Sequence, residues 1–323
     1  MQPHANSRDI QISIIVPLYN EEKVIPHLVD RLLRVMSERQ ETIEIIFVDD
    51  GSTDQSAIQL VPLCMNDQRF QYISFSRNFG HQVALSAGLF YARAKEAVFT
   101  IDGDLQDPPE LLGKFYEKFL EGYDVVYGIR NKRKEAGIKR VLYFSFYRLL
   151  GMISTLNFPV DSGDFCLISR KAVDIINQFP EESRFLRGIR SWIGFKQAGI
   201  PYSRDIRVAG SSKYSYRKLT RLAMNGIYNF SELPIRFISL LGLISILLSL
   251  VYLGATLINK FFYHTVPAGF TALLFTVILF SGVQLLSLGV IGEYVLRIFF
   301  QIKNRPLFII EKKVFDKQIT DGQ

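Results

Sequence analysis

Cysteine and tryptophan are scarce in this chain. Its 323 residues include two cysteines, Cys64 and Cys166, and one tryptophan, Trp192. The cysteines show none of the spacings typical of a zinc site, and we expect both to be reduced thiols. Residues 1–9 contain no apolar core, so we do not expect a signal peptide there.

Two common phosphate-binding signatures are also missing. No G-x-G-x-x-G follows the first expected strand, and no G-x-x-x-x-G-K-[ST] occurs. In both motifs, backbone amides hold phosphate groups at the start of a helix. Their absence disfavours dinucleotide-dependent dehydrogenases and P-loop NTPases. A bound diphosphate would instead need a metal ion and side chains.

Long apolar runs are confined to one part of the chain. Hydrophobic residues make up 48% of the sequence, and two runs, 235–258 and 270–292, follow each other after the first 230 or so residues. Each run exceeds the roughly 20 apolar residues with which a helix crosses a bilayer. A buried core helix is the alternative, but two such runs in succession favour a transmembrane hairpin.

Basic residues indicate the topology of this hairpin. Basic residues precede the first run and follow the second, whereas the basic side chains of residues 259–269 are those of Lys260 and one histidine. By the positive-inside rule, we expect a multi-pass protein of the inner (plasma) membrane with both ends in the cytoplasm. We therefore divide the chain into a cytosolic domain at 1–232, a membrane region at 233–300 and a cytosolic tail at 301–323.

The net charge of +7 fits anionic lipids or phosphorylated ligands as partners. Because the basic residues gather near the apolar runs and in one loop, we expect no nucleic-acid partner. The stretches 139–158 and 213–232 predict amphipathic helices at the membrane surface. Gln284 lies in the middle of an apolar run and indicates contact with a neighbouring helix, which favours a homo-oligomer.

Strand-like and helix-like segments alternate in the cytosolic domain. Near-continuous apolar strands separated by helices predict a Rossmann-like α/β fold, with a mainly parallel sheet and helices on both faces. Ligands of such sheets bind beyond the carboxyl ends of the strands. The expected strands are 12–16, 43–48, 70–74, 97–101, 124–127 and 165–168, and the expected helices are 21–39, one from 54, and 82–94.

Polar clusters follow these strands, at 17–22, 49–54, 77–81 and 102–107. We expect them to share one edge of the sheet, although helix caps and turns explain each cluster singly. Two further segments, 130–140 and 207–213, carry arginines, lysines and small residues. They fit phosphate capture, or else a solvated loop and a linker.

The most informative cluster begins with Asp102, Gly103 and Asp104. In an extended segment alternate side chains point the same way, so Asp102 and Asp104 can converge, and Gln106 can join them. Gly103 permits a tight turn and the close approach of a ligand. Mg²⁺ is usually held by one or two carboxylates together with substrate phosphates. The cluster therefore predicts a metal–diphosphate site, with a simple turn before a helix at Pro108 as the alternative.

Together these motifs resemble those of family 2 glycosyltransferases of the GT-A fold. More narrowly, they resemble the enzymes that glycosylate polyprenyl phosphates, such as the bactoprenol glucosyltransferases and dolichol-phosphate mannose synthase. The resemblance extends over the whole chain, because the bacterial branch also ends in two membrane spans. The motifs are DGDLQDPPE at 102–110 and the segments 16–21, 48–54, 77–81, 161–165 and 212–214.

This resemblance implies a role for each motif. The implied ligands of Mg²⁺ or Mn²⁺ are Asp102, Asp104 and Gln106. The residues implied in binding a nucleotide sugar, with a UDP-sugar favoured, are Pro17, Tyr19, Asn20, Glu21, Asp49, Asp50, Ser52, Asn78, Gly80, His81, Asp102, Gly103, Arg207, Ser212 and Lys213. The residues implied in catalysis are Asp102, Asp104, Arg130, Arg140, Asp161 and Asp164, with Arg130 and Arg140 meeting the lipid phosphate.

The implied reaction is the inverting transfer of one sugar to undecaprenyl or another polyprenyl phosphate at the cytosolic membrane face, for cell-envelope glycan modification. A phosphate monoester is mostly dianionic at pH 7, so its attack needs no strong general base. The Gln-x-x-Arg-Trp motif of processive relatives is missing, because Trp192 follows Arg190 and Ser191 with no glutamine at the first position. A single transfer is therefore favoured.

Several alternatives stay open. The resemblance suggests glucose from UDP-glucose, but GDP-mannose, a UDP-aminoarabinose type and UDP-GlcNAc are other donors. Asp161 or Asp164 would orient the acceptor or the sugar, or Asp161 would cap a turn. A processive transferase, a nucleotidyltransferase and a non-catalytic membrane scaffold are other functions. The intact pair of Asp102 and Asp104 argues against the scaffold.

Overall fold

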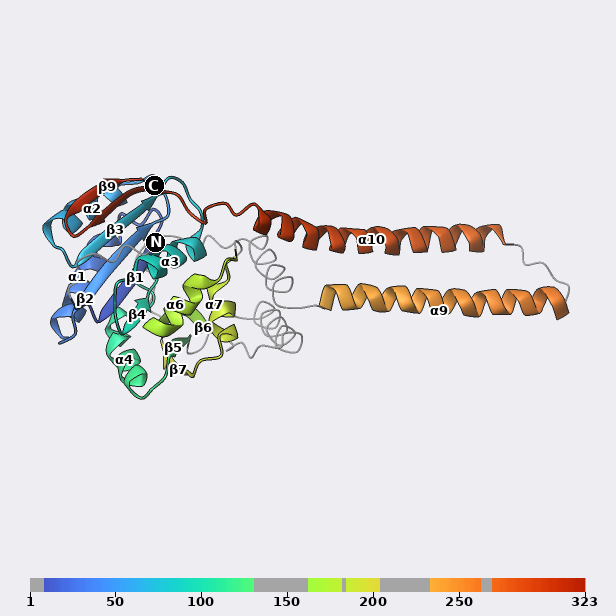
Figure 1. Ribbon diagram of the computed structural model, residues 1–323, viewed down its shortest axis with the longest axis horizontal. Coiled ribbons are helices and arrows are strands. Elements are labelled where there is room, and N and C mark those ends of the chain that lie inside the picture. The colour runs from blue at the N-terminus through green and yellow to red at the C-terminus, as the bar shows by residue number, and fades with distance from the viewer. Residues whose placement is uncertain (1–8, 131–161, 182–183, 204–232, 263–268, 323) are drawn as a thin grey trace. The chain divides into compact units, whose positions relative to one another are not determined.

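The computed structural model describes residues 9–130, 162–181, 184–203, 233–262 and 269–322. The chain divides into two compact units (Figure 1). One unit contains the sheet together with the C-terminal residues from Arg305, and the other contains two long helices. The chain thus leaves the sheet unit, forms the helical unit and returns to the sheet unit.

The first unit is built on a nine-stranded mixed sheet with the order β7-β5-β6-β4-β1-β2-β3-β8-β9. Strands β4, β1, β2 and β3 are parallel neighbours, and β5 and β7 run in the same direction, while β6 is antiparallel to both β4 and β5. This confirms the predicted α/β fold with a mainly parallel sheet. The strands are β1 Ile12–Leu18, β2 Ile43–Asp49, β3 Phe70–Phe75, β4 Ala97–Thr100, β5 Val125–Arg130, β6 Ser162–Ser169, β7 Gln197–Tyr202, β8 Ile310–Phe315 and β9 Gln318–Asp321.

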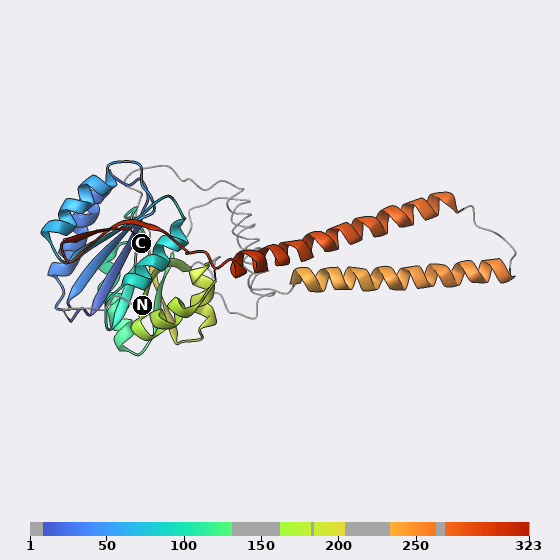
Figure 2. The same ribbon diagram turned by 45° about the horizontal axis from the view of Figure 1, so that its top comes forward.

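Helices cover both faces of the sheet (Figures 1 and 2). Alternate residues of β1 enter two cores, so that Ile14 belongs to the core under α1, α2 and α4, and Ile15 to the core under α3, α6 and α7. Because both faces are covered, β1, β2 and β3 are buried along their whole length. The helices are α1 Ile25–Ser37, α2 Ser56–Asn66, α3 His81–Tyr91, the short 3₁₀ helix η1 Pro109–Leu111, α4 Leu112–Leu120, α6 Arg170–Gln178 and α7 Leu186–Trp192.

The C-terminal tail forms the edge of this sheet. Strand β8 pairs antiparallel with β3, and β9 pairs with β8. Arg93 fastens the tail, since its Nη1 lies 2.7 Å from Asp316 Oδ2 while its Nε donates to Glu44 Oε2 at 2.8 Å. Glu44 is buried and also accepts a hydrogen bond from Ser13 Oγ. The tail therefore pairs with the sheet of its own domain.

The second unit contains α9 Leu233–Phe262 and α10 Phe270–Ile302, which lie side by side (Figures 1 and 2). Among the described residues, the segment Leu279–Ile302 is the one long and apolar enough to cross a membrane, whereas the apolar stretch Leu240–Tyr252 of α9 is shorter. A crossing by the first predicted run stays a prediction. The predicted surface helices at 139–158 and 213–232 lie outside the described residues.

Candidate functional site

The carboxyl edge of the sheet collects the polar loops. The loops after β1, β2, β3, β4 and β5 reach this edge because these strands run in one direction. The antiparallel strand β6 starts at the same edge, which brings Asp164 to it. The described residues that the sequence singled out therefore lie along one side of the sheet, as the rule for ligand sites in such sheets requires.

The loops after β1 and β2 are tied to each other. Asn20 has a φ of +55°, its backbone N–H donates to Ser52 Oγ at 2.9 Å, and its side-chain Oδ1 accepts from Thr53 N at 2.8 Å. Glu21 N donates to Ser56 Oγ in the same way. These bonds fix the backbone that directly follows Tyr19, whose side chain is exposed at the edge. The pair of loops thus offers a rigid support with an exposed aromatic ring.

Asp49 and Asp50 at the end of β2 both point into the protein. Asp49 accepts hydrogen bonds from Tyr72 Oη at 2.7 Å and from Ser52 N at 2.8 Å. Asp50 accepts from the backbone N–H groups of residues 79 and 80 at 2.6 and 2.9 Å. Burial raises the pKa of Asp50, against the lowering effect of those two N–H groups. Both carboxylates shape the loops, and their contact with a nucleotide stays a prediction.

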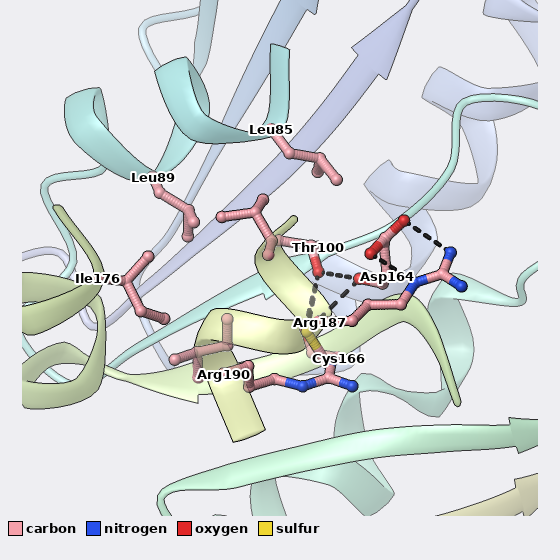
Figure 3. Close-up of a pocket in the computed structure, with 10 residues that line it drawn as sticks. Leu85, Leu89, Thr100, Asp164, Cys166, Ile176, Arg187 and Arg190 are labelled. Atoms are coloured by element: carbon pink, nitrogen blue, oxygen red, sulfur yellow. Dashed lines mark hydrogen bonds and ion pairs between the residues drawn. The ribbon is translucent and has the colours of Figure 1, made fainter. Parts of the chain in front are cut away.

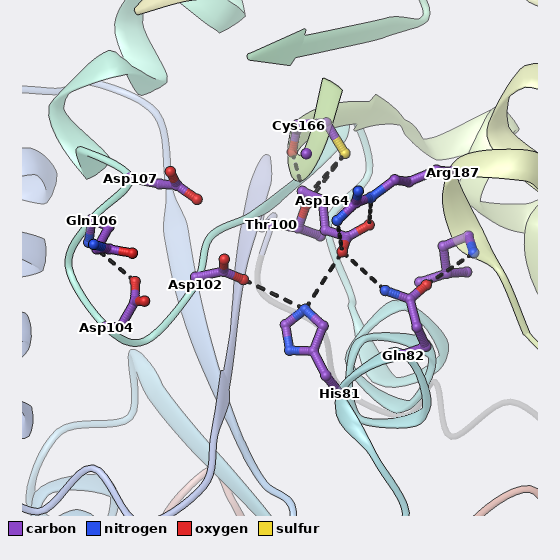
Figure 4. Close-up of polar contacts among 12 residues, drawn as sticks. His81, Gln82, Thr100, Asp102, Asp104, Gln106, Asp107, Asp164, Cys166 and Arg187 are labelled. Carbon is purple, nitrogen blue, oxygen red and sulfur yellow. Dashed lines mark hydrogen bonds and ion pairs between the residues drawn. The ribbon is translucent and has the colours of Figure 1, made fainter. Parts of the chain in front are cut away.

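The loop after β4 turns sharply, and its carboxylates Asp102 and Asp104 point in different directions. Strand β4 ends at Thr100, and residues 103–105 form a turn and a bend with Leu105 at a φ of +56°, so this segment does not keep the extended geometry expected of it. Asp102 points toward His81, with Oδ1 3.5 Å from Nε2, whereas Asp104 Oδ1 accepts from the backbone N–H of Gln106 at 3.1 Å (Figure 4). The three predicted metal ligands therefore share one loop but point in different directions.

The donor set of this loop fits a divalent cation that shares its ligands with a substrate. Within the described ranges, no group of three or more His, Cys, Asp and Glu side chains is arranged to hold a metal ion. Asp102 and Asp104 nevertheless supply two hard carboxylates on one loop, and Mg²⁺ in phosphate sites needs one or two carboxylates with the remaining oxygens from water and phosphate. The loop suits a cation that arrives with a diphosphate better than a permanent metal centre.

Asp164 is the most constrained carboxylate of the edge. It accepts hydrogen bonds from Arg187 Nε at 2.9 Å, Arg187 Nη2 at 2.8 Å and Gln82 Nε2 at 2.9 Å, and its Oδ2 lies 3.6 Å from His81 Nε2 (Figure 4). Burial would raise the pKa of Asp164, but the charge of Arg187 and the bonds from His81 and Arg187 hold it well below its usual range. Asp164 is thus a fixed anion with its oxygens in use.

His81 stands between Asp164 and the loop that carries Asp102. Gly80, at a φ of +106°, precedes it, and His81 is the first residue of α3 with a side chain that is 42% exposed. Burial would lower the pKa of His81, but the bond to Asp164 and the charges of Asp102 and Asp164 raise it to about 9. The two carboxylates thus favour the imidazolium form of His81. The sequence singled out Asp102, Asp164 and His81, and the structure brings them together.

Arg187 and Gln82 are site residues that the sequence analysis missed. Both hold Asp164, and Gln82 Oε1 also accepts from Leu186 N at 3.0 Å, which fixes the start of α7. No sequence motif marks Arg187, because its partner Asp164 lies in another element and 23 residues earlier in the chain.

A small pocket lies behind Asp164, inside the core under α3, α6 and α7. Its walls are mainly aliphatic, with Leu85, Leu89 and Ile176 on one side and the pair of Asp164 and Arg187 on another (Figure 3). Ion pairs next to apolar walls are poorly screened by water. The pocket therefore explains why the charge of Asp164 depends on its partners, and not on solvent.

Arg130 is the last residue of β5, which is separated from β4 by β6. Its Nε donates to Tyr202 Oη at 3.4 Å, and its guanidinium lies beside Gly163. Asn78 is exposed in the loop that leads to α3. The remaining predicted residues, Arg140, Asp161, Arg207, Ser212 and Lys213, lie outside the described residues.

Gly103 is needed for the path of the loop that carries Asp102 and Asp104. A Cβ at this position would lie 2.4 Å from Leu18 Cδ2 and 2.9 Å from the backbone oxygen of Pro17. We expect Gly103→Ala to displace the loop and to lower kcat/KM about 10- to 100-fold, because a shift near 1 Å at reacting groups costs that much. Steady-state kinetics of sugar transfer measure it.

Gly113→Ala in α4 is the matched control for this substitution. A Cβ at Gly113 would meet only the flexible end of the Arg39 side chain, at 3.0 Å. We expect activity within about twofold of wild type, since alanine also favours a helix. Equal losses in the two variants would contradict the assignment of Gly103 to the loop's path.

Comparison with known proteins places this fold and edge in a family. The model of Glycosyl transferase family 2 matches residues 13–176, which include β1 to β6 and the cluster around Asp102. The chain is 45% identical to the uncharacterized glycosyltransferase YkcC of Bacillus subtilis, over 95% of each chain. It is 38% identical to the bactoprenol glucosyl transferase of Shigella phage SfII, over 94% of this chain and 98% of that protein.

Solved structures with a similar arrangement include residues 1–349 of Staphylococcus aureus TarS in complex with UDP-GlcNAc. The TM-score is 0.43 at 18% identity, over 68% of this chain and 67% of that chain. Glucosyl-3-phosphoglycerate synthase from Mycobacterium tuberculosis gives a TM-score of 0.44 at 19% identity, over 68% and 77%. The family match and the long alignments show that the chain belongs to glycosyl transferase family 2 and is a glycosyltransferase.

Proposed function

We propose that this protein transfers one sugar from a nucleotide sugar to a polyprenyl phosphate at a membrane surface, with inversion at the anomeric carbon. The observation that carries the proposal is the 38% identity to a bactoprenol glucosyl transferase over nearly the full length of both chains. An apolar helix long enough to cross a membrane, Leu279–Ile302, supports a lipid acceptor. By the same similarity, glucose from UDP-glucose is the proposed donor.

On the donor side, the loops after β1, β2 and β4 would bind the nucleotide sugar. Asp102 and Asp104, with Gln106, would hold Mg²⁺ or Mn²⁺ on the diphosphate. The bound cation would neutralise the charge that builds up on the leaving nucleoside diphosphate. Tyr19 is exposed beside these loops, where its ring can contact a base or a ribose. The rigid loop pair around Asn20 would place the donor before the acceptor arrives.

On the acceptor side, the protein's task is to hold a second anion close to the first. The second pKa of a phosphate monoester is near 6, so the acceptor oxygen is already charged at pH 7. Asp164 suits this chemistry because its pKa lies well below the usual range and Arg187 occupies both its oxygens, which makes it a poor base. Its role would be to hold His81 and Arg187 as cations near the reaction.

The helices α9 and α10 would keep the enzyme where its acceptor is. We propose that both cross the bilayer and that the catalytic domain and the C-terminal tail lie in the cytoplasm, as the basic residues outside the two runs favour. A prenyl chain stays in the bilayer, so an anchored enzyme meets it in two dimensions, at a higher effective concentration. Gln284 within α10 supports a homo-oligomer as a further proposal.

The test is a transfer assay with the full chain in detergent. Radiolabelled UDP-glucose, UDP-GlcNAc, UDP-aminoarabinose and GDP-mannose are each offered with undecaprenyl phosphate, with Mg²⁺, with Mn²⁺ or with a chelator. Undecaprenol, which lacks the phosphate, is the matched control acceptor. We expect a labelled lipid from one donor, dependent on a divalent cation and on the acceptor phosphate.

Two results would contradict the proposal in different ways. Product with undecaprenol but not with its phosphate would move the acceptor to a hydroxyl group. No lipid product from any donor, despite nucleotide binding, would favour a non-catalytic membrane scaffold.

A further inference from the structure

Asp107 is a third carboxylate of the loop after β4, and it turns away from the first two. It is 1% exposed, and its Oδ1 accepts a hydrogen bond from Tyr202 Oη at 2.6 Å. Tyr202 is the last residue of β7 and is itself 4% exposed. A buried carboxylate is costly unless its partners hold it. The bond therefore fixes both the loop and the end of β7.

The same tyrosine hydroxyl faces Arg130 at the end of β5. Arg130 Nε donates to Tyr202 Oη at 3.4 Å, so the hydroxyl stands between a cation and an anion. Burial would lower the pKa of Arg130, but the charge of Asp107 is the largest of the influences that raise it, followed by the bond to Tyr202. Within the part of the chain that the structure describes, Arg130 Nη1 and Nη2 donate no hydrogen bond to a protein oxygen, so the outer end of the guanidinium can contact a ligand.

Two glycines make room for this arrangement. A Cβ at Gly128 would lie 2.6 Å from Tyr202 Cε1 and 2.7 Å from Phe165 Cδ1, and a Cβ at Gly163 would lie 3.1 Å from Arg130 Nη2. The Tyr202 ring also packs edge-on against Phe165, at 5.1 Å between centroids. A side chain at position 128 would collide with the Tyr202 ring, and one at position 163 would crowd the guanidinium. The site of Arg130 is therefore built into both strands.

The strand order separates Arg130 and Tyr202 from the loops proposed to bind the nucleotide. The sequence β7-β5-β6-β4-β1-β2 places Arg130 and Tyr202 on one side of the loop after β4, and Asn20, Asp49 and Asp50 on the other. Both halves share that loop, because Asp107 belongs to the same run of residues as Asp102 and Asp104. Arginine forks match phosphate oxygens in geometry and charge.

We propose that Tyr202, held by Asp107, is a positioning residue that sets the Arg130 guanidinium for the phosphate of the acceptor. The proposal rests on the proposed function, since it needs a phosphate acceptor. It adds that the Tyr202 hydroxyl contacts both Asp107, in the loop after β4, and Arg130.

The test compares Tyr202→Phe with Tyr116→Phe in the full chain. Tyr116 is the matched control, because it is also buried and its hydroxyl also donates to a carboxylate, Glu96 Oε2 at 2.5 Å, in α4 away from Arg130. Tyr202→Phe is expected to raise the KM for undecaprenyl phosphate about tenfold and to leave the KM for the nucleotide sugar within about twofold. Tyr116→Phe is expected to change neither.

A double-mutant cycle links the effect to Arg130. If Tyr202 acts through Arg130, adding Tyr202→Phe to Arg130→Ala costs little beyond Arg130→Ala alone. Additive losses would overturn the proposal, and so would an unchanged acceptor KM in Tyr202→Phe. A raised donor KM with a normal acceptor KM would assign Arg130 to the donor diphosphate and would also overturn it.

Binding of farnesyl phosphate, measured without donor by calorimetry, separates this proposal from the proposed function. If the wild-type protein makes no lipid product yet binds farnesyl phosphate, and Tyr202→Phe weakens that binding about tenfold while farnesol stays unbound, the proposed function fails and the arginine site stands. If the wild-type protein transfers sugar but both variants bind farnesyl phosphate equally well, the positioning role fails and the function stands.

Discussion

Replacing either Asp102 or Asp104 by asparagine is expected to lower the rate of sugar transfer at least about 1,000-fold while the protein stays folded. Asparagine keeps the size of the side chain and removes its charge. A divalent cation on a diphosphate takes hard, charged oxygens as ligands, and an amide oxygen is a weaker substitute. The negative charge on the leaving nucleoside diphosphate would then lack its counter-charge.

The surroundings of both residues tolerate the change of charge. Asp104 accepts a backbone hydrogen bond from Gln106, which an amide oxygen can also accept. The Asp102 side chain is 26% exposed and faces His81, whose N–H can donate to an amide oxygen as well. We therefore expect unfolding midpoints within about 3 °C of wild type, since asparagine keeps the size of the side chain and an oxygen that accepts these hydrogen bonds. The loss would concern the reaction and not the fold.

Cation binding provides the readout that separates this role from a structural one. In the wild-type protein, Mn²⁺ should tighten the binding of the donor nucleotide, and in both variants this gain should disappear. Asp124→Asn is the matched control, because Asp124 pairs with Lys171 at 2.8 Å just before β5, at the opposite end of the strands. Transfer above about one tenth of the wild-type rate in either variant would contradict the assignment.

The sheet was predictable because its strands are buried on both faces. Such strands read as continuous apolar runs, and the expected segments 12–16, 43–48 and 70–74 all lie inside observed strands. Strand β7 was missed because Gly199 and Pro201 weaken its signal. Pairing with β5 forms this strand. The side chains of Ile129 and Tyr127 fill the space that a side chain at Gly199 would need. Tertiary contacts decide such segments, and local sequence does not.

Helix ends were harder to predict than helices. The second apolar run was predicted over residues 270–292, and Glu293 and Arg297 follow it. In the structure α10 continues to Ile302, and Arg297 Nη2 lies 2.9 Å from Glu293 Oε1 one turn away. A pair at this spacing supports a helix. Charges that end an apolar run therefore need not end the helix.

The site was predictable as a set of loops but not as a set of contacts. The expected edge contains the aspartates, His81 and Arg130, because strand ends can be read from the sequence. Which way each side chain points depends on partners from distant segments, such as Tyr72 for Asp49 and Tyr202 for Asp107. These contacts join elements that are brought together only by the completed sheet.

The second large effect is expected at Asp164. Asp164→Asn removes a buried negative charge between two cations, Arg187 and His81. The amide group of asparagine also presents donor hydrogens to the donors of Arg187. We expect transfer to fall about 100-fold or more, because both cations lose their fixed positions. We also expect a loss of about 3 kcal/mol in the free energy of unfolding, since a buried pair is broken on one side.

Asp174→Asn in α6 is the matched control. Asp174 pairs with Arg170 at 2.6 Å, but its side chain is 46% exposed, so water replaces the lost partner. We expect a change within about 0.5 kcal/mol and normal transfer. Thermal unfolding in detergent and steady-state kinetics measure both quantities. Similar losses in the two variants would show that burial of the Asp164 pair has no special effect.

The double variant Asp164→Asn with Arg187→Gln decides whether stability and activity have the same origin. In the single variant the cost comes from breaking the Asp164–Arg187 ion pair next to the apolar pocket of Leu85 and Leu89. Removing the charge of Arg187 as well should restore the free energy of unfolding to within about 1 kcal/mol of wild type. Transfer should stay low, because the cation that Asp164 holds is now absent. If transfer recovers together with stability, Asp164 and Arg187 serve the fold alone, and the acceptor side of the site must rely on His81 and Arg130.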